Sequence, residues 1–395
     1  MKRVRLSAVL THPIQYYAPW FRYIAANAPL IDLKVHYCVT VTPEQQGVGF
    51  DEPFTWDNSM FGGYDHVVLS NPSQRVESHS SAFFGVTVPQ IVQSIRKASA
   101  DVILVPGWYS ASLVAAAVTA RMAGTPVVYR GDSQLLTPRG LPGPAKRFRT
   151  RSILRMFTHY LSVGKRNHDY LRHYGIPESR IFFSPACVDN EFFAGLAAAS
   201  DRQLQRKAMD IAPHAFVALF AGKLEAKKRP WEVIEAAGRM DNPPVVVIAG
   251  SGDAEERCRI AAERSKGQVI FLGFRNQTEI ARAYGLSDCL VLPSDSGETW
   301  GLVVNEALAV GLPCVVSDQV GSGPDLIEDR KTGYVTPFAN IDELARTLAK
   351  LRAQLASGED FATACRERAA EYSFRTATAG LEAAVESAVR ARRPT

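Results

Sequence analysis

The stretch CLVLPSDSGETWGLVVNEALAV, residues 289–310, determines the interpretation of the fold. Four apolar residues predict a buried strand, the polar residues after them predict a loop, and an apolar helical pattern begins at Leu302. Gly301 allows a ligand to approach the backbone, and the first helical amides, at Leu302 and Val303, are free donors at the positive end of the helix dipole. The unit is therefore a strand–loop–helix element whose loop is suited to an anion.

The same alternation of short apolar runs and helical stretches extends along the chain. The runs are apolar continuously, as expected for parallel strands that are covered by helices on both faces. The expected strands are residues 4–10, 33–38, 67–69, 102–105, 127–129, 181–183, 216–220, 244–249, 269–272, 289–292 and 314–316. Examples of the expected helices are residues 110–123, 230–238, 253–265 and 302–310. This pattern predicts a doubly wound α/β protein.

Two such series, each with its own first strand, predict two Rossmann-like domains that face each other across a cleft. We expect an acceptor-binding domain at residues 1–200 and a donor-binding domain at residues 201–373. A last helix at residues 374–395 is expected to cross back to the first domain. Ligands of open α/β sheets bind beyond the carboxyl ends of the strands, so the loops there should line the cleft.

Composition excludes several classes of protein. The chain has 395 residues, 46% hydrophobic and 22% charged, and a formal charge of +5, which is too small to indicate nucleic-acid binding without a local cluster. The cysteines are scattered and favour buried, reduced thiols over a disulfide framework or a zinc site; they are Cys38, Cys187, Cys258, Cys289, Cys314 and Cys365. No apolar run reaches the length of a membrane span, and the basic start lacks a signal-peptide core, so we expect a cytoplasmic protein.

Two further loops carry charge or glycine after a strand. Gly222-Lys223 and Lys228 follow the strand at 216–220, and two cations there suit a pyrophosphate, although a solvated basic turn has the same sequence. Gly250-Ser-Gly252 follows the next strand and admits a phosphate or ribose, but a single G-x-G is weak evidence. The pair Glu298 and Glu306 is equally weak alone, since helices contain such pairs by chance.

In this order, the elements resemble the donor half of retaining glycosyltransferases of family 4, which have the GT-B fold. The family pattern is G-[RK]-x(4)-K, G-x-G, E-x(7)-E and G-x-P-[VC]-V-x-S, and its last element matches Gly311-Leu-Pro-Cys-Val-Val-Ser317. The resemblance implies that Lys223 and Lys228 hold the donor diphosphate, and that Glu298 bonds hydroxyls of the donor sugar. It also implies that Glu306 binds the ribose. The remaining implied donor contacts are Gly222, Gly250, Gly252, Gly301, the amides of Leu302 and Val303 at the distal phosphate, and Phe274 within the segment 273–275 near the base.

The resemblance also implies the chemistry. The anomeric configuration is retained without a protein nucleophile, because the diphosphate oxygen takes the acceptor proton on the same face. Asp295 has no carboxylate two residues away, so no Asp-x-Asp metal motif is present and we expect no metal. No cofactor is expected beyond the co-substrate, a UDP- or GDP-sugar.

The acceptor half carries weaker signals. His12 and Gln15 follow the first strand, where related enzymes often have a glycine-rich loop, and either they contact an acceptor or His12 braces the loop. Trp108 stands after the fourth strand, where the family often has a histidine, and is compatible with stacking on a sugar or with packing. Arg130 and Asp132 follow the fifth strand and are expected to face the cleft, with a surface ion pair as the alternative.

Basic residues cluster in residues 139–172, where Asp169 is the one acidic residue. They are Arg139, Lys146, Arg147, Arg149, Arg151, Arg155, Lys165, Arg166 and Arg172. Such a stretch suits an anionic membrane surface with a lipid-linked acceptor, or is a solvated helix face.

Three functions remain after the sequence analysis. A glycosyltransferase, in polysaccharide, lipopolysaccharide or glycolipid assembly, fits the donor motifs. A nucleotide-sugar epimerase, or a phosphorylase of similar architecture, is the alternative within enzymes. A non-catalytic two-domain binding protein is the alternative outside them, and it would not need Lys223 and Lys228.

Overall fold

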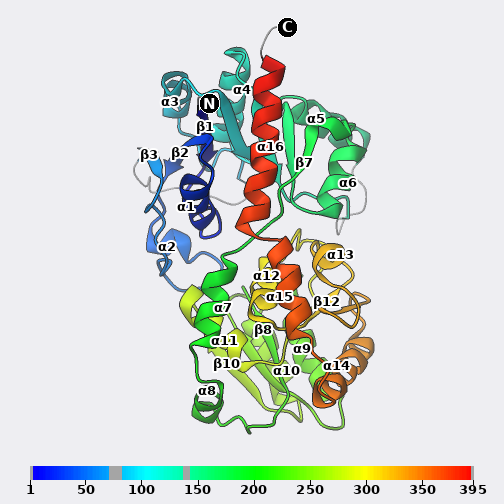
Figure 1. Cartoon of the computed structure of the whole chain (residues 1–395). Coiled ribbons are helices and arrows are strands. Elements are labelled where there is room, and N and C mark those ends of the chain that lie inside the picture. Colours follow the sequence, from blue (N-terminus) through cyan, green and yellow to red (C-terminus); the bar gives the residue numbers. More distant parts are fainter. Residues whose placement is uncertain (1–2, 71–81, 137–142, 393–395) are drawn as a thin grey trace.

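The computed structural model describes residues 3–70, 82–136 and 143–392, which form two α/β domains stacked end to end (Figure 1). Within the described residues each domain contains one parallel sheet. The prediction of two Rossmann-like domains is confirmed.

The N-terminal sheet has the strand order β3-β2-β1-β4-β5-β6-β7. Its strands are β1 (Val4–Leu10), β2 (Ile31–Val39), β3 (Asp65–Ser70), β4 (Val102–Pro106), β5 (Val127–Gly131), β6 (His159–Ser162) and β7 (Ile181–Phe183). Its helices are α1 (Tyr17–Asn27), α2 (Pro43–Gln46), α3 (Gln90–Ala98), α4 (Ala111–Met122), α5 (Pro144–Leu154) and α6 (Lys165–His173). The order reverses between β1 and β4, which is the switch point of a doubly wound sheet.

The C-terminal sheet repeats this topology with the order β10-β9-β8-β11-β12-β13. Its strands are β8 (Val217–Ala221), β9 (Val245–Ala249), β10 (Val269–Gly273), β11 (Cys289–Leu292), β12 (Cys314–Ser317) and β13 (Gly333–Thr336). The helices of this half are α7 (Asn190–Ala198), α8 (Arg202–Ala208), α9 (Trp231–Gly238), α10 (Glu255–Glu263), α11 (Gln277–Leu286), α12 (Leu302–Val310), α13 (Gly323–Leu326), α14 (Ile341–Ala356) and α15 (Ala362–Glu371). Its switch point lies between β8 and β11.

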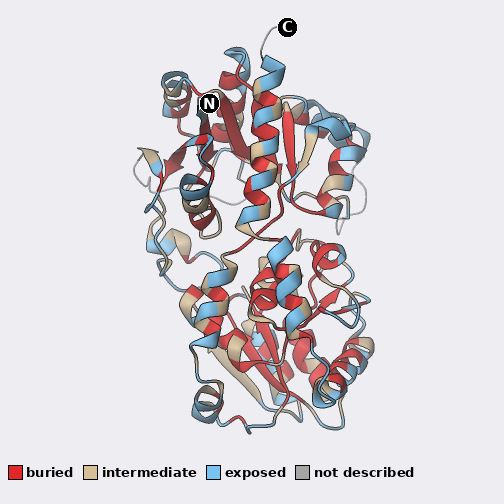
Figure 2. Ribbon diagram, viewed as in Figure 1, coloured by how far each residue is buried: buried red, intermediate tan, exposed pale blue. Residues whose placement is uncertain are grey.

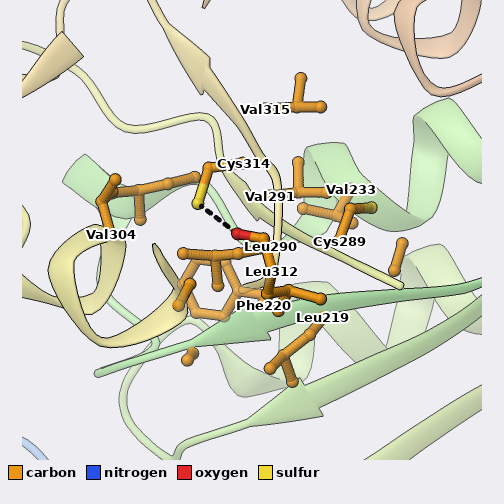
Figure 3. Packing of buried hydrophobic residues seen from close by; sticks show 14 of the residues in the cluster. Leu219, Phe220, Val233, Cys289, Leu290, Val291, Val304, Leu312, Cys314 and Val315 are labelled. Carbon is orange, nitrogen blue, oxygen red and sulfur yellow. Dashed lines mark hydrogen bonds between the residues drawn. The ribbon is translucent and has the colours of Figure 1, made fainter. Parts of the chain in front are cut away.

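The central strands are buried along their whole length because helices cover both faces (Figure 2). Phe220 on β8, Val291 on β11 and Val315 on β12 belong to the core of the C-terminal domain, and Val304 of α12 packs on it (Figure 3). Burial of such side chains stabilises the fold by about 1.5–3 kcal/mol each. The cysteines are all buried and unpaired, as the sequence analysis predicted.

The connection between the two domains includes α7, which lies just before the expected boundary at residue 200. The chain leaves the first sheet after β7, and α7 already packs against α11 and α12 of the second domain. The reason is the apolar side of α7, where Phe193 is buried in the C-terminal core. The last helix, α16 (Phe374–Arg392), runs back along the N-terminal domain and packs on β6 and β7 (Figure 1).

Two strands of the structure were not expected from the sequence. They are β6, with the sequence HYLS, and β13, with the sequence GYVT. Each has four residues and mixes polar with apolar side chains, so neither forms an apolar run. In the part of the chain that the structure describes, no helix is both long and apolar enough to cross a bilayer.

Candidate functional site

The loops after β8 and β11 lie on either side of the switch point of the C-terminal sheet. The first loop carries Lys228, and the second carries Glu298. The Nζ atom of Lys228 lies 2.5 Å from Oε2 of Glu298. Each side chain is 13% exposed, so the pair is largely shielded from water and its attraction is stronger than at an open surface. Two residues 70 positions apart, both predicted for the site, thus meet at one point.

The backbone of the glycine turn explains why glycine stands at its start. Gly250 has a φ of 150°, and a Cβ atom at this residue would lie 1.9 Å from the carbonyl oxygen of Gly222. No side chain fits there, so the two predicted loops pack backbone against backbone. The amide of Leu224 donates to the carbonyl of Ser251 at 2.8 Å and fixes this arrangement.

The N-terminus of α12 lies directly beyond Glu298. Gly301 caps the helix in the left-handed region, with a φ of 91°, which strongly favours glycine. The amides of Leu302 and Val303 are in the first turn, where no preceding helical carbonyl accepts from them. Lys228 and this helix end therefore supply positive charge on the same side of the sheet.

Glu306 is buried within α12, with both carboxylate oxygens hydrogen-bonded. Tyr284 of α11 donates its hydroxyl to Oε2 at 2.6 Å, and Tyr16 of the N-terminal domain donates to Oε1 at 2.9 Å. Burial raises the pKa of Glu306 to about 7, although the two hydroxyls and the charge of Lys228 act in the opposite direction. Neither tyrosine was predicted for the site. Tyr16 is 290 positions from Glu306 and lies in the other domain, and Tyr284 belongs to a neighbouring helix, 22 positions away.

Lys223 points toward the other domain rather than toward Lys228. Its Nζ atom donates to the carbonyl of Val48 at 2.7 Å and lies 4.8 Å from the ring centroid of Phe50. Burial lowers the pKa of Lys223. Phe274, which follows β10, is likewise covered by rings of the N-terminal domain, with 4.1 Å between its ring centroid and that of Phe54.

The loop after β1 holds two of the expected acceptor-side residues. Nδ1 of His12 lies 3.0 Å from the hydroxyl of Thr11, which in turn lies 3.0 Å from the hydroxyl of Tyr109. Burial lowers the pKa of His12 to about 4, so the imidazole is neutral at pH 7. Gln15 is half-buried in the same loop, and Trp108 packs partly against the core of the N-terminal domain.

Arg130 is enclosed by groups of the protein, so the alternative of a surface ion pair does not hold. It is buried, donates to the carbonyl of Pro185 at 2.7 Å, and its guanidinium lies 4.6 Å from the ring centroid of Trp20. A guanidinium with five donors is held inside the domain because carbonyls and aromatic rings surround it. Asp132, in contrast, reaches the C-terminal domain, where it accepts from the hydroxyl of Thr299 at 2.6 Å.

The basic stretch is divided between two surfaces, so it is not one face. The exposed side chains of α5 and of the residue after it include Lys146, Arg147, Arg149, Arg151 and Arg155. Lys165 and Arg166 of α6 instead contact the C-terminal domain, where they donate to the carbonyls of Pro324 at 2.8 Å and Gln319 at 2.9 Å. The Nε atom of Arg172 lies 3.5 Å from Oε2 of Glu178. Arg139 lies outside the described residues.

The arrangement of two Rossmann-like domains is shared with known proteins. A glycosyltransferase of Rickettsia africae covers 99% of this chain and is itself covered completely, with a TM-score of 0.71 and 13% identity. Anabaena HepE, solved in complex with UDP, has a TM-score of 0.72 and 16% identity over 98% of this chain and all of its own. At such identities the likeness establishes the fold, which is GT-B.

Sequence comparison finds relatives of the C-terminal half of the chain. Residues 201–371 match the family described as glycosyl transferases group 1. The D-inositol 3-phosphate glycosyltransferase of Mycobacterium marinum is 31% identical over 197 residues, which are 48% of this chain and 42% of that protein. The match spans less than half the length of this relative. The C-terminal domain is therefore similar to glycosyl transferases group 1, and the chain joins that domain to a second Rossmann-like domain in a GT-B fold.

Proposed function

We propose that this protein is a retaining glycosyltransferase that moves a hexose from a nucleoside diphosphate sugar to a hydroxyl group. The observation that carries the proposal is the shielded ion pair of Lys228 and Glu298 at the switch point, beside the glycine turn and the N-terminus of α12. A leaving diphosphate needs compensating positive charge, and a carboxylate beside it suits sugar hydroxyls. Anabaena HepE, with the same fold, has been solved with UDP and with UDP-glucose, which favours a UDP-sugar over a GDP-sugar as donor.

In this proposal each group at the site has one role. Lys228 and Lys223 neutralise the diphosphate, and the amides of Leu302 and Val303 donate to its distal phosphate. Glu298 orients the donor sugar by accepting from its hydroxyls. Glu306 accepts from the ribose hydroxyls, since each of its oxygens has capacity for a donor besides the tyrosine it already binds.

Retention follows if the acceptor attacks on the face from which the diphosphate departs. The bond between the anomeric carbon and the diphosphate oxygen breaks, the bond to the acceptor oxygen forms, and the acceptor proton passes to the diphosphate. Lys228 and the helix dipole stabilise the charge that develops on the leaving oxygen, so neither a divalent ion nor another cofactor is needed. His12, Gln15, Trp108 and Asp132 remain the candidates on the acceptor side.

The acceptor is proposed to be a growing glycan or a lipid-linked sugar in polysaccharide, lipopolysaccharide or glycolipid assembly, at the inner face of the membrane. The support is α5, on which basic residues surround Phe148, a ring that is 74% exposed. Cations with an exposed aromatic ring suit an anionic bilayer surface.

We expect Phe148→Asp to abolish co-sedimentation with phosphatidylglycerol vesicles, and Met122→Asp, at an exposed site on α4, to leave it unchanged. Equal binding of both variants would exclude α5 as the contact.

A donor screen tests the proposed activity. Purified protein is incubated with UDP-, GDP- and ADP-sugars, and release of the nucleoside diphosphate is followed with and without EDTA. We expect one donor class to be turned over and the rate to be unchanged by EDTA, because Lys228 and α12 already supply the positive charge. Absence of both turnover and thermal stabilisation with every donor would refute the proposal, and loss of activity on chelation would refute its metal-free form.

A further inference from the structure

A segment of the N-terminal domain lies on the candidate nucleotide site of the C-terminal domain. It consists of residues 48–58 and follows α2 at the junction of the two domains (Figure 1). We call this segment the lid. Its backbone meets the two phosphate-side loops. The carbonyl of Val48 accepts from Lys223 at 2.7 Å, and the carbonyl of Phe50 accepts from the hydroxyl of Ser251 in the glycine turn. Two carbonyl oxygens thus take the donors that a diphosphate would need.

The aromatic side chains of the lid surround Phe274. The ring centroid of Phe54 lies 4.1 Å from that of Phe274, with an angle of 32° between the ring planes. The ring centroid of Phe50 lies 4.8 Å from that of Phe274, with an angle of 67° between the planes. Trp56 also belongs to this cluster, with its ring centroid 6.4 Å from that of Phe274. A nucleobase that stacked on Phe274 would need the volume that the ring of Phe54 fills.

The end of the lid is fastened to the start of α11. The carboxylate of Asp57 accepts from the amide of Thr278 at 2.9 Å and from its hydroxyl, in the first turn of α11. A carboxylate at this place is favoured by the helix dipole. The side chain of Asn276 donates to the carbonyl of Thr55 at 2.7 Å. These polar contacts fasten the lid at its end, beside the aromatic cluster at its middle.

The closed lid also leaves polar atoms without partners. Among the described residues, Nε1 of Trp56 and Oδ1 of Asn58 are buried and accept or donate no hydrogen bond. A buried polar group without a partner is unfavourable, so the closed position of the lid is stabilised less than its contacts alone suggest. Val48, at the start of the lid, remains 65% exposed.

We infer that the lid is an autoinhibitory element whose carbonyls and Phe54 occupy the nucleotide subsite in the free protein, so that a nucleoside diphosphate binds only when the lid leaves. This inference rests on the proposed function. The lid belongs to the acceptor domain and the subsite to the donor domain, so donor binding is coupled to a rearrangement between the domains. The apparent affinity for the nucleotide is reduced by the fraction of molecules in which the lid is closed.

The test compares nucleotide binding by three variants of the full chain. Asp57→Ala removes the bonds to Thr278, Phe54→Ala removes the ring on Phe274, and Glu52→Ala is the matched control. Glu52 is exposed in the same segment and, within the described residues, its side chain makes no hydrogen bond to the C-terminal domain. Binding of UDP, GDP and ADP is measured by calorimetry. We expect Asp57→Ala and Phe54→Ala to bind the preferred nucleotide about tenfold more tightly than the wild type, and Glu52→Ala to bind as the wild type does.

Hydrogen exchange provides a second measurement on the wild-type protein. Saturating nucleotide is expected to increase exchange of the amides of residues 48–58, because their contacts with the C-terminal domain are lost. Unchanged or weaker binding by both variants, or protection of the lid by nucleotide, would overturn the inference while leaving the nucleotide site itself intact. If no nucleotide binds to the wild type or to any variant, the proposed function fails and the inference falls with it.

Discussion

Lys228→Ala is expected to lower kcat/KM for sugar transfer by about 10²–10³-fold, the usual loss when one preorganised donor to a developing anion is removed. Lys228 supplies the cation nearest to Glu298, at 2.5 Å, in a position that is largely shielded from water. In the proposed mechanism the variant loses charge at the leaving diphosphate, and it leaves the carboxylate of Glu298 without its cation. Steady-state kinetics with the donor found by the screen give the measurement, and circular dichroism checks that the variant is folded.

The neighbouring lysine provides the control for this prediction. Lys227 is 44% exposed and pairs with Glu225 at 3.1 Å, so Lys227→Ala is expected to leave kcat/KM unchanged. Glu298→Ala, the second member of the pair, is expected to abolish transfer while nucleotide affinity stays within about threefold of the wild type. If Lys228→Ala transfers sugar as fast as Lys227→Ala, the diphosphate is not bound here. If Glu298→Ala loses nucleotide binding instead of transfer, its role at the sugar is wrong.

The fold was predictable because its signal is local. Continuous apolar runs of five or more residues, such as 245–249, can be buried only in a sheet that is covered on both faces, and helices separate them. The two missed strands, β6 and β13, have four residues each and are fixed by pairing with neighbouring strands rather than by their own composition. The packing of α7 on the C-terminal domain was not predictable for a related reason. The partner of α7 is decided by which surface accepts Phe193, and the helix itself does not contain that information.

The candidate site was predictable where its residues follow strands of one domain. Lys228 and Glu298 belong to loops on either side of the switch point, so topology brings them together once both strands are assigned. Contacts between the domains carry no such signal. The pairing of Tyr16 with Glu306, and of Val48 with Lys223, depends on how one domain sits on the other. The surroundings of Arg130 were not predictable either, because Trp20 of α1, whose ring lies against its guanidinium, is far from it in the sequence.

The buried carboxyl group of Glu306 has a consequence for stability that depends on pH. Its pKa is about 7 in the folded protein, raised chiefly by burial from the ordinary value of 4.5. Below pH 4.5 the group is protonated in both the folded and the unfolded chain. Between pH 4.5 and about 7 the unfolded chain releases the proton and the folded chain keeps it, so the free energy of unfolding falls as the pH rises. Above about 7 both forms are ionised, and the contribution no longer changes.

Glu306→Gln is therefore expected to remove a pH-dependent loss of stability. A raised pKa of this size corresponds to about 3 kcal/mol between pH 4.5 and 8, at roughly 1.4 kcal/mol for each unit. The amide of Gln keeps an acceptor for one tyrosine hydroxyl and cannot ionise, so the variant should gain on the wild type by that amount across this range. Denaturant unfolding at pH 5, 6, 7 and 8 measures the difference, with Glu256→Gln, at an exposed position of α10, as the control. Wild type and Glu306→Gln curves that stay parallel from pH 5 to 8 would mean that the carboxyl group is ionised throughout, held by Tyr16, Tyr284 and Lys228 against the cost of its burial.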